Sequence, residues 1–110
     1  MCNYQTLFHD DGLGYIVRCN ECENIQVGYG NMVITFSYED FSAFRSWLAR
    51  IEEEQAPELN PALRCIFIPT PCEGVKLLLS KSELFDMINM FDQADVELQS
   101  LALLRLFNVE

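Results

Sequence analysis

Two segments of this 110-residue chain share a pattern that limits the folds open to it. In each segment an apolar stretch leads to a serine, an acidic residue stands three positions after the serine, and apolar residues at helical spacing follow. The first copy covers residues 31–41 and the second covers residues 74–84. A serine hydroxyl that accepts a hydrogen bond from the backbone three residues on is a common helix start. The pattern therefore predicts two junctions from strand to helix, at Ser37 and Ser80.

Each of these copies is preceded by another apolar, β-branched stretch, which favours a strand. We expect strands over residues 14–19, 25–29, 31–36, 63–68 and 75–79. Helices are expected to begin after Ser37 and Ser80, and Asp95 is expected to cap a separate last helix. The predicted fold class is α+β: an antiparallel sheet of about five strands with two or three helices on one face, and with the two copies as a candidate ββα repeat.

The two parts of the chain on either side of residues 52–61 are too small to fold well separately. This segment contains three successive acidic residues and two prolines, which bar helix continuation. A chain of this length supports one core. We therefore expect a single domain over residues 1–110.

The charge of the chain argues against two classes of partner. The formal net charge is −10, and the seven basic residues are scattered along the sequence. Nucleic acids and anionic membrane surfaces are bound through clustered basic residues, so neither partner is expected. No apolar run approaches the roughly 18 residues of a membrane span, and residues 1–5 lack the features of a signal peptide. These observations predict a cytoplasmic protein, in which the five cysteines stay reduced or bind metal.

The strongest local motif is a C-x-x-C sequence at Cys19 and Cys22, between two expected strands. Two thiolates at this spacing can bind one tetrahedral zinc ion from a tight turn. The expected additional ligands are Cys2 and His9, which would give a Cys₃His set, and Cys72 is the alternative. Two other interpretations stay open: reduced, partly buried thiols that pack as small apolar side chains, and a redox pair.

The sequence offers little for catalysis. His9 is the only histidine and lies in a polar stretch with Asp10 and Asp11, where a histidine is most often a solvated surface residue. There is no Ser/His/Asp order, phosphate-binding loop or calcium-loop pattern. We expect no catalytic residues and no organic cofactor, and we interpret the chain as a non-enzymatic protein.

Three short segments of the first half carry a family resemblance: residues 14–22 with the C-x-x-C motif, residues 26–31, and Asp40-Phe41 at the helix start. Over about residues 2–50 the chain resembles a family of small uncharacterised bacterial proteins, chiefly from Bacteroidota. The resemblance implies a bacterial, cytosolic origin and carries no assigned activity.

The C-terminal residues 98–107 are apolar on nearly every side, so a helix there needs cover on more than one face. We therefore expect an interaction module that binds a protein partner, most simply a second copy of itself. The alternative hypothesis is a zinc-binding or thiol-based regulatory protein that uses Cys19 and Cys22. In the alternative structural interpretation, the C-terminal helix fills the core and the protein is a monomer.

Overall fold

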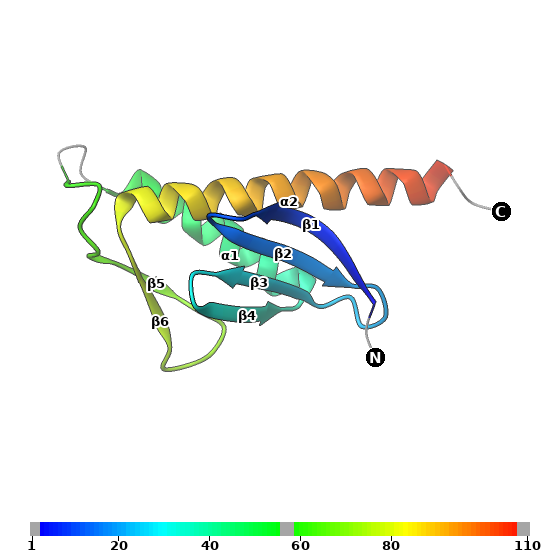
Figure 1. Cartoon of the computed structure of the whole chain (residues 1–110), viewed down its shortest axis with the longest axis horizontal. Helices are drawn as coiled ribbons and strands as arrows, with labels where there is room; N and C mark the ends of the chain where they lie inside the picture. Colours follow the sequence, from blue (N-terminus) through cyan, green and yellow to red (C-terminus); the bar gives the residue numbers. More distant parts are fainter. Residues whose placement is uncertain (1–2, 56–58, 108–110) are drawn as a thin grey trace.

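The first half of the chain forms an antiparallel meander of four strands. The structure is a computed structural model that describes residues 3–55 and 59–107. The strands are β1 (Tyr4–Asp10), β2 (Gly14–Cys19), β3 (Ile25–Tyr29) and β4 (Met32–Phe36), and they lie in that order across the sheet (Figure 1). The last three confirm the strands expected there, whereas β1 is an additional strand that pairs with β2.

Two glycines let this meander fold tightly. Gly30 joins β3 to β4 with a φ of 61°, a backbone conformation that other residues adopt rarely. Gly28 lies inside β3, opposite Tyr15 of β2, and a Cβ atom there would collide with the Tyr15 ring. Gly28 thus provides space for an aromatic ring, while Gly30 provides the turn between β3 and β4.

The first helix begins where its capping serine predicts. Helix α1 (Tyr38–Glu53) follows Ser37, whose Oγ accepts a hydrogen bond of 3.1 Å from the Asp40 backbone N–H. Its buried side chains recur at spacings of three and four, as one face of a helix requires, and they are Phe41, Phe44, Leu48 and Ile51.

The next two strands form a sheet of their own. Strands β5 (Ile66–Pro69) and β6 (Lys76–Leu79) pair only with each other, as an antiparallel hairpin. The expectation of about five strands in a single sheet is therefore corrected to a four-stranded sheet and a separate two-stranded one. The hairpin contributes four side chains to the core, those of Ile66, Ile68, Leu77 and Leu79. The two sheets therefore pack on the same core although no backbone hydrogen-bond ladder joins them.

Helix α2 (Lys81–Phe107) begins with the predicted capping box. The Glu83 backbone N–H donates to Ser80 Oγ at 3.1 Å, and the Ser80 backbone N–H donates to Glu83 Oε1 at 2.9 Å. The expected separate last helix is wrong, because α2 continues unbroken through Asp95. That carboxylate lies mid-helix, where it accepts from Gln99 and pairs with Arg45 of α1.

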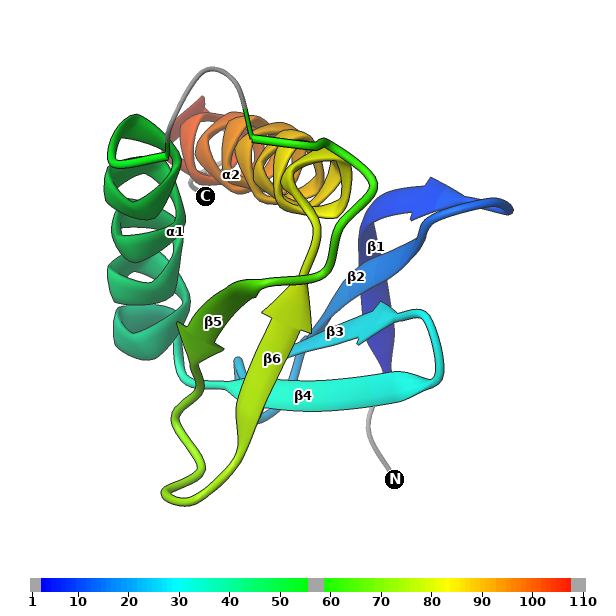
Figure 2. The same cartoon turned by 90° about the vertical axis from the view of Figure 1, so that its left-hand side faces the viewer.

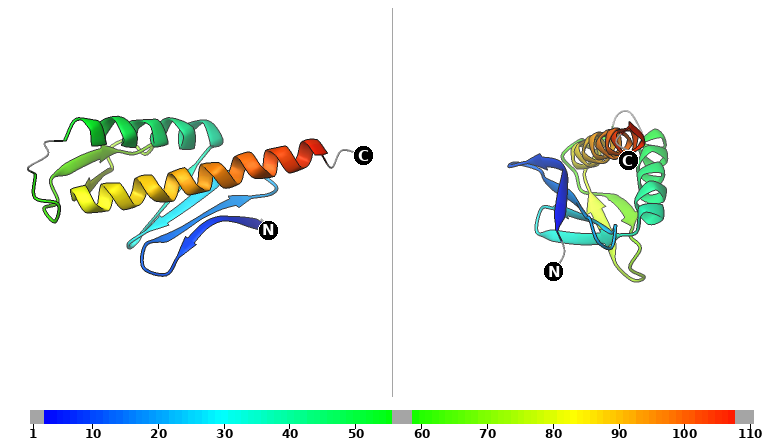
Figure 3. Two further views of the ribbon diagram at one scale, coloured as in Figure 1. Left: turned by 90° about the horizontal axis from the view of Figure 1, so that it is seen from above. Right: turned by 90° about the vertical axis from the view of Figure 1, so that its right-hand side faces the viewer.

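The helices and sheets enclose one aromatic-rich core. In Figure 2, α2 and α1 cover two adjoining sides while the curved meander and the β5–β6 hairpin complete the enclosure, and Figure 3 shows the same arrangement from the opposite end. Phe91 of α2 stacks on Phe41 of α1 with ring centroids 4.8 Å apart. Phe36 of β4 meets Phe91 edge-on at 6.0 Å, so these rings join both helices to the sheet.

Helix α2 makes the molecule elongated. It lies on β1 and β2 and then extends past the sheet, so that its last turns project from the body (Figures 1 and 3). The principal extents are 54 × 26 × 26 Å. The radius of gyration is 15.0 Å, against about 13 Å for a compact chain of this length. Among the described residues, no helix is both long and apolar enough to cross a membrane.

Candidate functional site

The most unusual surface of the protein is the projecting end of α2. We call residues 101–107 the α2 tip. Leu103 and Leu104 are each 55% exposed, Leu106 is 71% exposed and Phe107 is 83% exposed. Isolated apolar side chains on a surface are ordinary, but four large ones on consecutive turns of one helix form a patch. The α2 tip is therefore a candidate interaction surface.

The two faces of α2 have different roles. Phe91, Ala94 and Leu98 recur at spacings of three and four and are buried against the body. The opposite face carries Val96, Ser100, Leu103 and Phe107, all of them exposed and also at helical spacing. The core face thus ends near Leu98, whereas an outward apolar stripe continues to the end of the helix.

A hollow of about 220 Å³ lies where the α2 tip leaves the body. It is lined by Arg18 at the end of β2, Glu23 in the β2–β3 turn, Tyr38 at the start of α1, and Leu98, Gln99 and Ala102 of α2. The lining combines a cation, a carboxylate, a phenol and an amide with the apolar side chains of a leucine and an alanine. Three parts of the chain that are distant in sequence build this hollow, so sequence patterns did not indicate it.

Arg18 is the least expected residue of this hollow. Because side chains alternate along a strand, Arg18 shares the core-facing side of β2 with the fully buried Ile16. Its Nε atom is shielded from solvent and has no hydrogen-bond partner among the described residues. Two other arginines form ion pairs, Arg45 with Asp92 and Asp95 and Arg64 with Glu83, and Arg50 stacks on Trp47.

The C-x-x-C sequence forms a tight turn at the same end of the molecule. The Cys22 backbone N–H donates to Cys19 Sγ at 3.4 Å, and the Glu23 backbone N–H donates to the Cys19 carbonyl at 2.9 Å. Glu23 closes the turn with a left-handed φ of 63°. Cys19 is 1% exposed, whereas Cys22 is exposed, so the two thiols occupy different environments.

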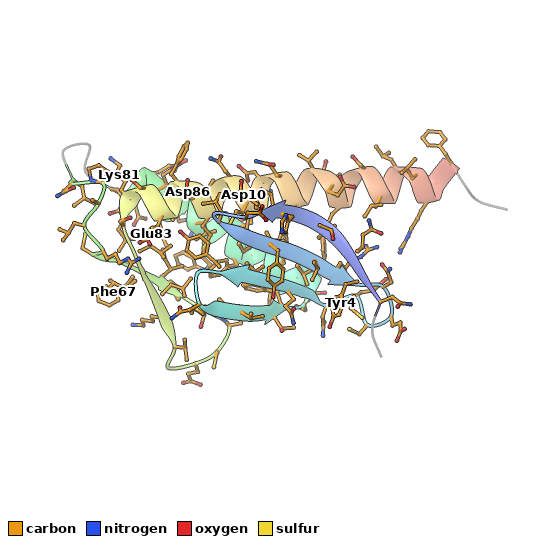
Figure 4. The ribbon with its side chains drawn as sticks, in the orientation of Figure 1. Tyr4, Asp10, Phe67, Lys81, Glu83 and Asp86 are labelled. Atoms are coloured by element: carbon orange, nitrogen blue, oxygen red, sulfur yellow. The ribbon has the colours of Figure 1, made fainter. Side chains whose placement is uncertain are left out.

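The other expected ligands are not brought to this turn. In the β1–β2 ladder Cys19 lies opposite Tyr4, whereas His9 lies opposite Tyr15 near the other end. Figure 4 labels Tyr4 and Asp10, which mark these two ends of β1. A separation of five strand residues is on the order of 15 Å, far beyond the roughly 2 Å of a zinc bond. His9 instead lies 3.5 Å from Asp11, with both side chains exposed.

The remaining thiols do not complete a site either. Cys2 lies outside the described residues, and Cys72 is exposed in the β5–β6 turn. Among residues 3–55 and 59–107, no three histidine, cysteine or acidic side chains are grouped closely enough to hold a metal ion.

A charged cluster occupies the opposite end of α2. Glu83 is labelled in Figure 4 with Lys81 and Asp86. Its carboxylate accepts three hydrogen bonds from Arg64: one of 2.7 Å from Nη2, and two from Nε, of 2.9 and 3.2 Å. The Arg64 guanidinium is the main reason that the pKa of Glu83 falls to about 2. Burial, and to a lesser extent the charge of Glu83, raise the pKa of the nearby Tyr29 to about 12. These contacts hold the start of α2.

Taken together, these features define a small α+β protein with one apolar helical end beside a polar hollow. The chain belongs to a family of unknown function, DUF6686, whose family model matches residues 1–110. The expected membership of an uncharacterised family is thereby confirmed. No curated protein and no solved structure matches the chain.

Proposed function

We propose that this protein is a non-enzymatic, cytosolic interaction module that pairs with a second copy of itself through the α2 tip. The observation that carries the proposal is the exposure of Leu103, Leu104, Leu106 and Phe107 on a helix that has already left the body. Residues 103–107, the last turn of α2, carry only exposed side chains, and a helical turn without tertiary support is only marginally stable in water. Packing against a partner both orders this turn and removes its apolar side chains from solvent.

The pattern of the outward stripe favours an identical partner. If two copies of α2 cross antiparallel about a two-fold axis, Val96 of one copy meets Phe107 of the other, and Ser100 meets Leu103. Each large side chain then faces a smaller one, which is the arrangement that packs without voids. A two-fold pairing also closes on itself, so it ends at a dimer.

The proposal is tested by light scattering on the full chain over a concentration series. A dimeric mass at micromolar concentration, falling to the monomeric mass on dilution, is the expected result. Leu104→Asp should give monomers with an unchanged circular dichroism spectrum, because Leu104 is exposed and contributes nothing to the core. A monomeric mass for the unsubstituted chain at every concentration would exclude the proposal.

A second candidate function, a zinc or thiol switch, is supported by the turn at Cys19 and Cys22. The backbone N–H of Cys22 donates to Cys19 Sγ, which fixes the position of this thiol in the turn. The Asn20 backbone N–H donates to the Asn3 carbonyl at 2.7 Å, so the residue following Cys2 is already beside the turn. We therefore keep Cys2 as the expected third ligand and no longer include His9.

Metal analysis of protein purified without chelators or a metal-affinity tag tests this second candidate. Stoichiometric zinc that is lost in both Cys19→Ser and Cys22→Ser supports it, and Cys72→Ser is the matched control at an exposed thiol. Zinc retained in all three variants would exclude the site. Metal-free protein whose melting temperature is unaffected by chelator would favour simple reduced thiols.

A further inference from the structure

The hollow beside the α2 tip has the chemistry of a small-ligand site. We propose that it binds a small zwitterion of the amino-acid type, with an apolar side chain. The carboxylate pairs with Arg18, the ammonium group pairs with Glu23, and the apolar side chain lies on Leu98 and Ala102. The inference does not depend on the proposed self-association, because one chain supplies every lining residue.

The unpaired guanidinium indicates the first ligand group. More than nine-tenths of buried polar groups in proteins have a partner, and an exception requires an explanation. Arg18 Nε is shielded without a partner among the described residues, and no acidic group of these residues lies within ion-pair distance of the side chain. Because Nε itself is shielded from solvent, a ligand in the hollow would meet Arg18 through its two Nη atoms. A guanidinium binds a planar carboxylate through two such parallel N–H donors.

The other lining residues restrict the ligand further. Glu23 places a negative charge on the same hollow, which disfavours a dianion such as phosphate and favours a ligand that also carries a cation. Leu98 and Ala102 provide an apolar wall, and the Tyr38 hydroxyl is a further donor or acceptor. The volume of about 220 Å³ is below the range of pockets for drug-sized molecules, so the ligand is small.

In the experiment, the full chain is titrated with three probes of similar shape. Binding is followed by titration calorimetry or by the NMR chemical shifts of the backbone amides. L-leucine carries both charges, 4-methylpentanoate carries only the carboxylate, and 3-methylbutylamine carries only the ammonium group. The expected result is saturable binding of L-leucine, with at least tenfold weaker binding of each single-charge probe. Absence of L-leucine binding up to about 20 mM, where a millimolar site is filled, overturns the proposal.

Variants separate the hollow from other surfaces. Arg18→Gln and the cavity-filling Ala102→Leu should each reduce affinity at least tenfold, and Arg50→Gln is the control at an arginine that stacks on Trp47 outside the hollow. Ala102→Leu keeps all charges and suits a helix, so it tests the site even if Arg18→Gln unfolds. Equal binding by Ala102→Leu and the unsubstituted chain would refute the location.

The proposed ligand site and the proposed self-association can be refuted independently of each other. Phe107→Asp, which removes the association surface without touching the hollow, should leave L-leucine affinity unchanged. Loss of binding in this variant would overturn the claim that one chain forms the complete site. Binding by a strictly monomeric protein would support the ligand site and reject self-association.

Discussion

Replacement of Phe107 by aspartate should dissociate the proposed dimer without unfolding its subunits. Phe107 is 83% exposed, so the monomer loses almost nothing by the change. Full burial of a phenylalanine side chain stabilises by about 1.5–3 kcal/mol, and a two-fold interface contains two copies of it. The dimer should therefore weaken by about 4 kcal/mol, which corresponds to a rise in Kd of roughly a thousandfold.

Sedimentation equilibrium over a wide concentration range measures this change directly. The matched control is Phe67→Asp, because Phe67 is 66% exposed on the outer face of the β5–β6 hairpin, away from the α2 tip (Figure 4). The control should keep the Kd of the unsubstituted chain. If both variants dissociate equally, general surface hydrophobicity drives association, and if neither dissociates, the α2 tip is not the interface.

The remaining predictions concern conditions and stability. Each copy carries a net charge of −10, so added salt should screen the repulsion between copies and strengthen self-association. Light scattering at low and high salt measures this change, and weaker association in salt would instead indicate pairing between opposite charges. Glu83→Ala should lower the free energy of unfolding by about 1 kcal/mol through loss of the capping box, whereas Glu83→Gln should keep the cap and lose only the charge. Since the folded-state pKa of Glu83 is about 2, its ionic contribution is complete above about pH 4.5 and is lost as the pH falls toward 2. The stability difference between Glu83→Gln and the unsubstituted chain should accordingly shrink on acidification in urea titrations, and a constant difference would contradict the assignment. Gly28→Ala should destabilise by about 1–3 kcal/mol, because the new Cβ meets the Tyr15 ring, and an unchanged melting temperature would show that the ring moves freely.

Local signals in the sequence predicted the elements better than their arrangement. The serine caps at Ser37 and Ser80 depend on residues three positions apart, so both helix starts could be read directly. The extra strand β1 had no such signal, because its alternation is weak and only Leu7 is fully buried in it. The split into two sheets depends on packing between distant residues, which a local pattern does not contain.

The error at Asp95 has a clear physical cause. An aspartate before an apolar stretch is a frequent helix cap. The buried residues of α2, however, keep the same helical spacing on both sides of Asp95, at Phe91, Ala94 and Leu98. No proline or glycine interrupts the segment, and Arg45 from α1 satisfies the carboxylate in place of a cap. That ion pair joins residues fifty positions apart and could not be predicted from spacing.

The two candidate surfaces, the α2 tip and the hollow at Arg18, also differ in how far the sequence predicted them. The apolar character of residues 98–107 is a property of the sequence, so the α2 tip could be predicted as a surface needing cover. The structure places Leu98 in the core and Leu104 on the surface, a distinction that depends on where the sheet ends. The hollow at Arg18 was missed because a single arginine in a strand gives no sign that a helix from the far end of the chain will lie above it.

The contact between α2 and β1 determines when this protein can fold during its synthesis. The meander leaves the ribosome first, with Leu7 and Ile16 on a face that α2 later covers. At about 5–20 residues per second, roughly 3–12 s pass between completion of β4 and arrival of Leu98. During that interval the nascent chain exposes an apolar sheet face and unpaired strand edges, the features that chaperones bind and that promote aggregation. Folding is therefore completed only after α2 has been made, and faster translation of residues 37–98 should reduce aggregation of the newly made protein.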